Sequence, residues 1–168
     1  MKNHNKGISL LELIIYVAIF SVIILVMSEI FFISIKGKDL ASVRFEVSQN
    51  MRFATEKIRQ AVFDASAINV SGACPLNVLS ATSTIGGATS SIFIDNGILK
   101  ISGANGVESI TSESVIATTT PADCLFTIIS NPQPAKATLQ TKLKIVYNSQ
   151  GRSDLDVAES QQITVSLR

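Results

Sequence analysis

The sequence predicts an α+β fold in which a long N-terminal helix, membrane-spanning in its first half and amphipathic in its second, packs on an antiparallel β-sheet. Three observations predict this fold: an apolar run over residues 8–35, a helical periodicity over residues 40–65, and short alternating segments with turn residues after residue 66. At 168 residues the chain has the length of about one domain.

The apolar run is long enough to cross a membrane. Residues 8–35 contain neither Gly nor Pro, and their only charged residues are Glu12 and Glu29. A helix of that length spans about 42 Å, against a hydrocarbon core of roughly 30 Å. The whole chain is only 16% charged, where soluble domains carry about 25%. The rest of the chain is too short to bury this helix on all sides, so we expect it to span a membrane.

Composition argues against an enzyme and against a nucleic-acid site. The chain has 14 Lys and Arg against 13 Asp and Glu, and a net charge of +1 offers phosphates no strongly basic surface. The single histidine, His4, lies near the start of the chain, and no serine has a base partner at a suggestive spacing. We therefore expect no catalytic residues, no cofactor and no direct nucleic-acid site.

The second half of the predicted helix has one apolar face. Phe45, Phe53 and Phe63 are expected to widen this face, and we expect one helix from about Ile8 to Phe63, with Gly37 as the point where a kink would fall. Apolar residues recur at steps of three and four, as in a helix packed on a sheet: Leu40, Val43, Val47, Met51, Ala54, Ile58, Ala61 and Ala65.

Short strand patterns follow the helix. Asn96-Gly97 lies between two of them and predicts a hairpin turn, and a second turn is expected at residues 103–106. We predict four to five antiparallel strands, and a loop over the Ser/Thr/Gly-rich residues 71–91. Six segments have strand patterns, from which the four to five strands of the sheet would come: residues 91–94, 98–101, 107–110, 125–130, 139–147 and 163–167.

The residues that precede the apolar run are unusual. Lys6 and Gly7 join a short basic leader to Ile8, and Glu12 places a carboxylate one turn into the apolar helix. A charge at the centre of a membrane helix costs about 2.5–3.5 kcal/mol and less near its end, so an intramembrane carboxylate is a functional candidate. The alternative is an interfacial glutamate whose side chain reaches back to water.

The segment KGISLLEL followed by IIYVAIFSVIILV resembles the prepilin-type cleavage and methylation motif of type IV pilins and pseudopilins. The resemblance implies that a prepilin peptidase cuts after Gly7, next to Lys6, and N-methylates Ile8. The family's glutamate, fifth in the mature chain, falls on Glu12. One departure is Ile8 itself, where the family most often has Phe.

Cleavage would give Glu12 a partner. It would leave an amine about one helical turn away, so that the carboxylate of one subunit can meet the amine of its neighbour. At an effective dielectric of about 20 and a separation of about 4 Å, the two charges attract by up to ~4 kcal/mol before desolvation. We therefore expect Glu12 to set the register of assembly.

The resemblance also implies a class, partners and a location. Residues 49–61 and 162–168 are similar to parts of minor pseudopilins, the J-type in particular, and Glu29 stands where many major pilins have a helix-bending proline. The implied protein is a minor pseudopilin or minor pilin of a filament used in secretion, adhesion or DNA uptake. Its partners would be prepilin peptidase, other pilins, the inner-membrane assembly platform and, before assembly, membrane lipid.

Orientation and rival classes follow from the same resemblance. The counts of flanking basic residues do not choose an orientation. The resemblance implies a cytoplasmic leader at residues 1–7, a membrane or filament-core helix at 8–36, and an amphipathic half-helix at 37–65 with a sheet at 66–168, both outside. Two alternatives remain: a major pilin, and an uncleaved, signal-anchored receptor or sensor domain.

The exported half holds the remaining candidate sites. Cys74 and Cys124 are the only cysteines, and an even number in an oxidising space favours a bridge that closes a loop of about 50 residues, over two free thiols in a reducing compartment. Asp154, Asp156 and Glu159 are weak calcium candidates because some pseudopilins bind calcium in a C-terminal loop. A solvated loop is the preferred interpretation of these three carboxylates.

Overall fold

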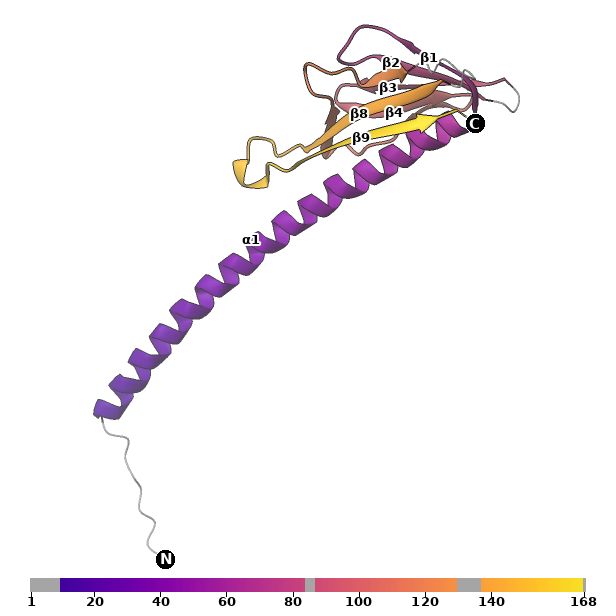
Figure 1. Cartoon of the computed structure of the whole chain (residues 1–168). Coiled ribbons are helices and arrows are strands. Elements are labelled where there is room, and N and C mark those ends of the chain that lie inside the picture. Colours follow the sequence, from indigo (N-terminus) through magenta and orange to yellow (C-terminus); the bar gives the residue numbers. More distant parts are fainter. Residues whose placement is uncertain (1–9, 84–86, 130–136, 168) are drawn as a thin grey trace, which may run out of the picture. The chain divides into compact units, whose positions relative to one another are not determined.

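The chain begins with one long helix and continues as short strands, as the sequence predicts (Figure 1). The computed structural model describes residues 10–83, 87–129 and 137–167. Helix α1 covers Leu10–Phe63 and contributes to both compact units of the chain, residues 1–41 and residues 42–168. The α+β class is confirmed, with antiparallel pairing between every pair of neighbouring strands in the described residues.

Helix α1 continues through Gly37 without the break considered for that position. A glycine inside a helix costs roughly 0.5–1 kcal/mol relative to alanine, which the long helical segments on both sides easily tolerate. A Cβ atom at Gly37 would meet nothing within 4 Å, so no close contact requires glycine at this position.

The second half of α1 buries the predicted apolar face, here called the stripe. The last buried residue of the stripe within the helix is Val62, where the sequence predicts Ala61. The expectation that phenylalanines widen the stripe is wrong, because Phe45, Phe53 and Phe63 are 70%, 49% and 50% exposed. Phe45 and Phe63 each lie nine residues from the fully buried Ala54, which is about two and a half turns, so they point away from the core. The buried residues are Val43, Val47, Met51, Ala54, Ile58 and Val62.

The strands form two sheets, where the sequence predicts one. The first sheet is an antiparallel meander of five strands in chain order. The expected loop over residues 71–91 is wrong, since it contains β2, where Leu79 and Ala81 are buried and alternate with half-exposed Ser80 and Thr82. The five strands are β1 (Ala65–Ser71), β2 (Val78–Ser83), β3 (Thr89–Asp95), β4 (Ile98–Gly103) and β5 (Gly106–Ser109).

The second sheet is organised around its longest strand, β8 (Thr138–Tyr147). β9 (Ala158–Ser166) pairs along one edge of β8, with Thr138 opposite Ser166 and Val146 opposite Ala158. β6 (Val115–Thr118) and β7 (Phe126–Ile129) pair with opposite ends of β8, so they share its other edge. The short 3-10 helix η1 (Ser153–Leu155) lies between β8 and β9. The expected strands within residues 125–129 and 139–147 are confirmed, and the last strand starts earlier than expected.

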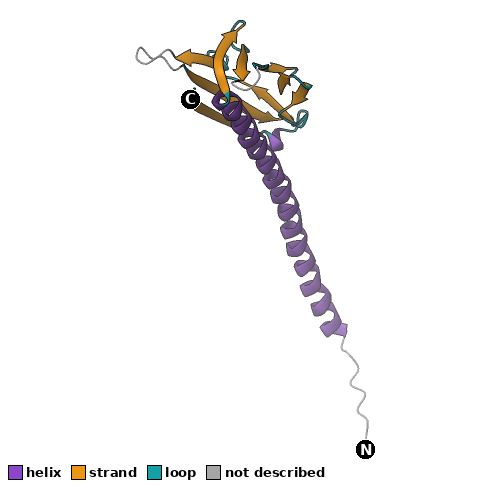
Figure 2. Cartoon of the chain, turned by 90° about the vertical axis from the view of Figure 1, so that its right-hand side faces the viewer, coloured by secondary structure: helices purple, strands orange, loops and turns teal. Residues whose placement is uncertain are grey.

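One core joins α1 and both sheets within residues 42–168 (Figure 2). Leu139, Thr141, Leu143 and Ile145 point inward at every second position of β8, as the alternation predicts. The largest fully buried side chains of this core are Phe126, Met51, Ile58, Leu79, Ile92, Leu99, Leu125, Leu139 and Ile145.

Polar contacts attach the β5–β6 connection to α1. Ser112 donates its backbone N–H to Asn50 Oδ1 at 2.9 Å, and Asn50 Nδ2 donates to Ser112 Oγ at 3.3 Å. The Ser114 hydroxyl donates to the Glu46 carboxylate. These side chains hold the connection next to the buried Ile110 and Thr111, whose backbone N–H groups donate to the Leu99 carbonyl.

The predicted Asn96-Gly97 turn joins β3 to β4. Both residues have positive φ, 51° and 78°, as a tight two-residue hairpin turn requires. The Gly97 carbonyl accepts a hydrogen bond from Ala117 N at 2.7 Å, so this turn of the first sheet holds the start of the second. A Cβ at Gly97 would lie 3.1 Å from Ile116 Cγ2.

We predict that Gly97→Ala destabilises the globular unit, residues 42–168, by about 1 kcal/mol or more. Alanine is strained at a positive φ, and its methyl group would crowd Ile116. Chemical denaturation measures the change. Gly103→Ala is the matched control in the same hairpin, since a Cβ there meets nothing within 4 Å. Equal losses for the two variants would contradict the argument.

Candidate functional site

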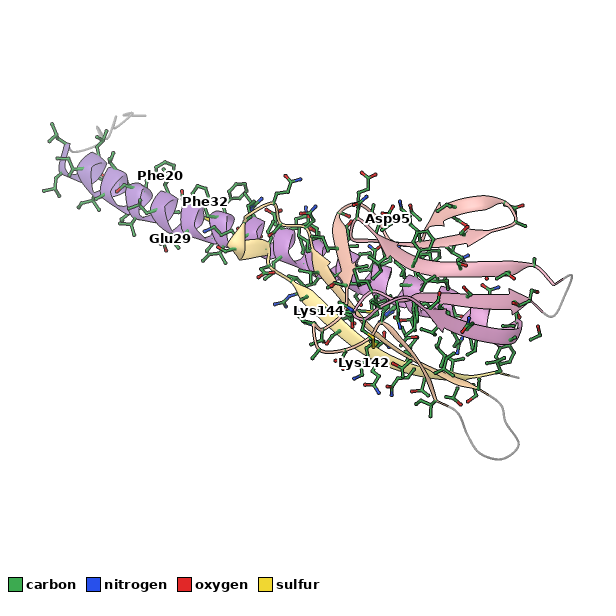
Figure 3. All side chains as sticks on the ribbon, turned by 90° about the horizontal axis from the view of Figure 1, so that it is seen from above. Phe20, Glu29, Phe32, Asp95, Lys142 and Lys144 are labelled. Carbon is green, nitrogen blue, oxygen red and sulfur yellow. A yellow bond between two sulfur atoms is a disulfide. The ribbon has the colours of Figure 1, made fainter. Side chains whose placement is uncertain are left out.

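The first half of α1 exposes its apolar surface in every direction. All residues from 10 to 39 are exposed, and the large apolar side chains among them range from 43% exposure at Ile35 to 78% at Leu10. Phe20 and Phe32 stand out from the helix in Figure 3. In the part of the chain that the structure describes, this is the one helix long and apolar enough to cross a membrane. Such a continuous apolar surface requires lipid or neighbouring helices around it.

Glu12 lies in the first turn of α1, within this apolar surface. The N-terminal end of a helix carries a partial positive charge, which favours a carboxylate there. The Tyr16 hydroxyl donates a hydrogen bond to Glu12 Oε1 at 3.2 Å, across the i,i+4 spacing that places both side chains on one face. Sequence reasoning did not identify Tyr16, although the i,i+4 spacing from an intramembrane carboxylate was a visible signal.

The predicted processing residues Lys6, Gly7 and Ile8 lie outside the described residues. The pairing of Glu12 with the amine of a neighbouring subunit therefore stays a prediction.

The two cysteines that the sequence pairs are joined in the structure. Cys74 and Cys124 form a disulfide with Cα atoms 4.8 Å apart, inside the usual range for such bonds. The bridge connects the segment after β1 to the residues before β7.

A buried asparagine, which sequence reasoning missed, supports the same junction. Asn77 is 4% exposed; its Nδ2 donates to the Phe126 carbonyl at 2.7 Å and its Oδ1 accepts from Phe126 N at 2.9 Å. Leu125 N donates to the Pro75 carbonyl at 2.9 Å. The amide side chain thus pairs with the β7 backbone as a strand would, and these bonds hold the two half-cystines near one another.

The weak calcium candidates do not converge. Asp154 forms an ion pair with Arg152 at 3.0 Å, and Glu159 lies on β9 opposite Ile145. Asp156 follows η1. Within the described ranges no group of three His, Cys, Asp or Glu side chains is placed to hold a metal ion. Asp154 and Asp156 lie in the connection between β8 and β9, whereas Glu159 belongs to a strand.

Lys100 and Lys142, each on a strand, have acidic neighbours. Lys142 lies 2.5 Å from Asp123, and Lys100 lies 2.7 Å from Asp95 (Figure 3 labels Asp95, Lys142 and Lys144). These partly exposed ion pairs are each worth about 0–1 kcal/mol and neutralise charge locally.

Comparison with known families finds the prokaryotic N-terminal methylation motif at residues 2–28. The matched segment contains the leader, the predicted cleavage site, Glu12, Tyr16 and most of the apolar run. No curated protein and no solved structure gives a significant match. Together with the pilin-like α+β fold, the motif supports a type IV pilin-like protein. The motif implies processing by a prepilin peptidase and assembly with other pilins, and the apolar helix fits an inner-membrane anchor.

We predict that a chain starting at Asp39 is soluble and monomeric, and that reduction or Cys74→Ser lowers its melting temperature. The apolar segment is then absent, while all buried residues of the core lie after residue 42. A bridge across 50 residues contributes ~4 kcal/mol in the chain-entropy model, which is large beside a typical stability of about 5–15 kcal/mol. Calorimetry with and without reductant measures the change, and an unchanged melting temperature would contradict a structural role for the bridge.

Proposed function

We propose that the protein is a structural subunit, a minor pseudopilin or minor pilin, of a bacterial type IV pilus-like filament, and that it is the substrate of a peptidase and not itself an enzyme. The observation that carries this proposal is the match of the methylation motif to residues 2–28, on a helix whose first half is exposed and apolar on all sides. A surface of this kind suits two environments in turn, first lipid and then the helices of neighbouring subunits.

The transfer from lipid to filament needs more than the hydrophobic effect. Lipid tails already satisfy apolar side chains, so helices associate in a membrane through close packing and polar contacts. A carboxylate is costly in lipid, which offers it no hydrogen-bond donor. Pairing Glu12 with the amine at residue 8 of a neighbour would therefore favour assembly and set its register, whereas the apolar side chains around it are tolerant of sliding.

The globular unit would lie outside the cytoplasm. Its disulfide suits an oxidising compartment, and residues 42–168 have a core of their own. An inner-membrane assembly platform would assemble the filament. The filament would serve secretion, adhesion or DNA uptake. Glu29, in place of a helix-bending proline, favours the minor class.

Two alternatives predict different observations. A major pilin would dominate sheared filaments, whereas a minor subunit would be scarce in them. An uncleaved receptor or sensor domain would retain its first seven residues.

We predict that the mature chain starts at N-methylated Ile8 and keeps 161 of the 168 residues. Intact-mass measurement of the protein extracted from membranes of a peptidase-positive host checks this. The same host without its peptidase is the control and should yield the full chain. Retention of residues 1–7 in the peptidase-positive host would remove the pilin assignment.

We predict that Glu12→Ala leaves cleavage after Gly7 largely intact and impairs N-methylation or assembly, because the carboxylate pairs with the new amine and is not needed for insertion. Mass spectrometry and the amount of subunit in sheared filaments measure the two effects. Glu29→Ala is the matched control on the same helix, 17 residues away and so about 26 Å from Glu12. Wild-type assembly and methylation of Glu12→Ala would show that the pairing is wrong.

A further inference from the structure

The contact between Tyr16 and Glu12 has no role in the function proposed so far. The phenolic oxygen and Glu12 Oε1 lie 3.2 Å apart on a face of α1 that no other described element covers. The two nearest hydroxyls among the described residues of the helix are used differently: Ser21 donates to the Ala18 carbonyl and Ser28 to the Ile24 carbonyl, each at 2.8 Å. Tyr16 thus directs a donor to the side chain of Glu12, whereas Ser21 and Ser28 serve the backbone.

A hydrogen-bond donor beside a carboxylate matters most in lipid. The hydrocarbon region contains no donor of its own, so a carboxylate there depends on groups of the protein or on access to the interface. An ionised carboxylate accepts at about four lone-pair sites on its two oxygens. Tyr16 occupies one site on Oε1, and no residue in the described part of the chain donates to Oε2.

The geometry is that of a loose bond. Hydrogen bonds between oxygens usually measure about 2.5–3.0 Å, and the separation here is 3.2 Å. The bond therefore restricts the carboxylate to the Tyr16 side of the helix and leaves it able to shift when a cation approaches.

We propose that Tyr16 is a positioning residue. While the subunit is in lipid, its hydroxyl keeps the Glu12 carboxylate of the same subunit close to the helix surface, so that Oε2 faces the amine of a neighbouring subunit. The assembly step in this inference rests on the proposed function. The hydrogen bond in lipid does not, and it can be measured on the isolated subunit.

Another explanation accounts for the tyrosine without the bond. Tyrosine and tryptophan are enriched at membrane interfaces, where their rings lie at the level of the headgroups. That explanation requires an amphipathic ring at residue 16 but no hydroxyl directed at Glu12. A double variant separates the two explanations, because in the Glu12→Ala background Tyr16→Phe lowers assembly further only if the tyrosine acts as an interfacial ring.

The first experiment measures the bond in vesicles that contain the full chain. The protein has two tyrosines and no tryptophan, so Tyr147→Phe leaves Tyr16 as the only fluorophore of its kind. A carboxylate that accepts the phenolic hydrogen quenches tyrosine emission. Adding Glu12→Ala to Tyr147→Phe should therefore increase the emission, whereas adding Glu29→Ala should leave it unchanged. Equal emission with and without Glu12 would overturn the contact.

The second experiment measures assembly as the ratio of subunit in sheared filaments to subunit in membranes. Tyr16→Phe should lower this ratio several-fold, because the assembly step must then order the Glu12 side chain that the hydrogen bond no longer holds. The substitution makes the helix more apolar, so a failure to insert does not explain a loss. Tyr147→Phe is the matched control, since it removes the other phenol and lies in the globular unit.

The variants distinguish the inference from the function on which it rests. Support requires that Tyr16→Phe causes no further loss in the Glu12→Ala background. Wild-type assembly of Tyr16→Phe, or an equal loss from Tyr16→Phe with and without Glu12, would overturn the inference alone when Glu12→Ala itself impairs assembly. Wild-type assembly of Glu12→Ala itself would remove the role of the carboxylate, and the positioning role of Tyr16 with it.

Discussion

The apolar surface of residues 10–35, exposed on all sides of one helix, is the constraint on which the rest of the molecule depends. Burying a large apolar side chain is worth about 1.5–3 kcal/mol, so a surface made of some twenty of them is not stable in water. Lipid or other apolar helices must surround it. This requirement accounts for the near absence of charge in the segment and makes Glu12 the feature that needs an explanation.

The same helix satisfies a different requirement after residue 42. There one stripe is buried on two sheets and the opposite face meets solvent, although the secondary structure does not change. Apolar spacing therefore predicts both halves from the sequence. It predicts β8 for the same reason, since Leu139, Leu143 and Ile145 alternate with lysines, and it predicts the Asn96-Gly97 hairpin because few residue pairs accept two positive φ angles.

The failures of sequence reasoning have three causes: weak local contrast, angular position on the helix, and long-range contacts. In β2 the inward residues include Ala81, whose small side chain gives little contrast with the serines and threonines around it. Asn77 is a strand-like partner only because Phe126 lies beside it, 49 residues later. Phe45 and Phe63 look like core residues by type, but their angular position relative to Ala54 excludes them from the core. The division of the strands into two sheets depends on which edges meet, and local pattern carries no such information.

Within the membrane half, polar groups carry the specificity because apolar ones cannot. A helix that slides past its neighbour by one turn exchanges one set of apolar contacts for another at small cost, whereas a carboxylate keeps a cation at one level only. Glu12 can act in this way only if its carboxylate stays close to the surface of its own helix and adopts few rotamers before a neighbouring subunit binds. A donor at the i+4 position meets both conditions at once, and the Tyr16 hydroxyl stands there. On this proposal the few polar atoms of the segment would determine how the subunit meets its neighbours, and the apolar residues would determine where that meeting takes place.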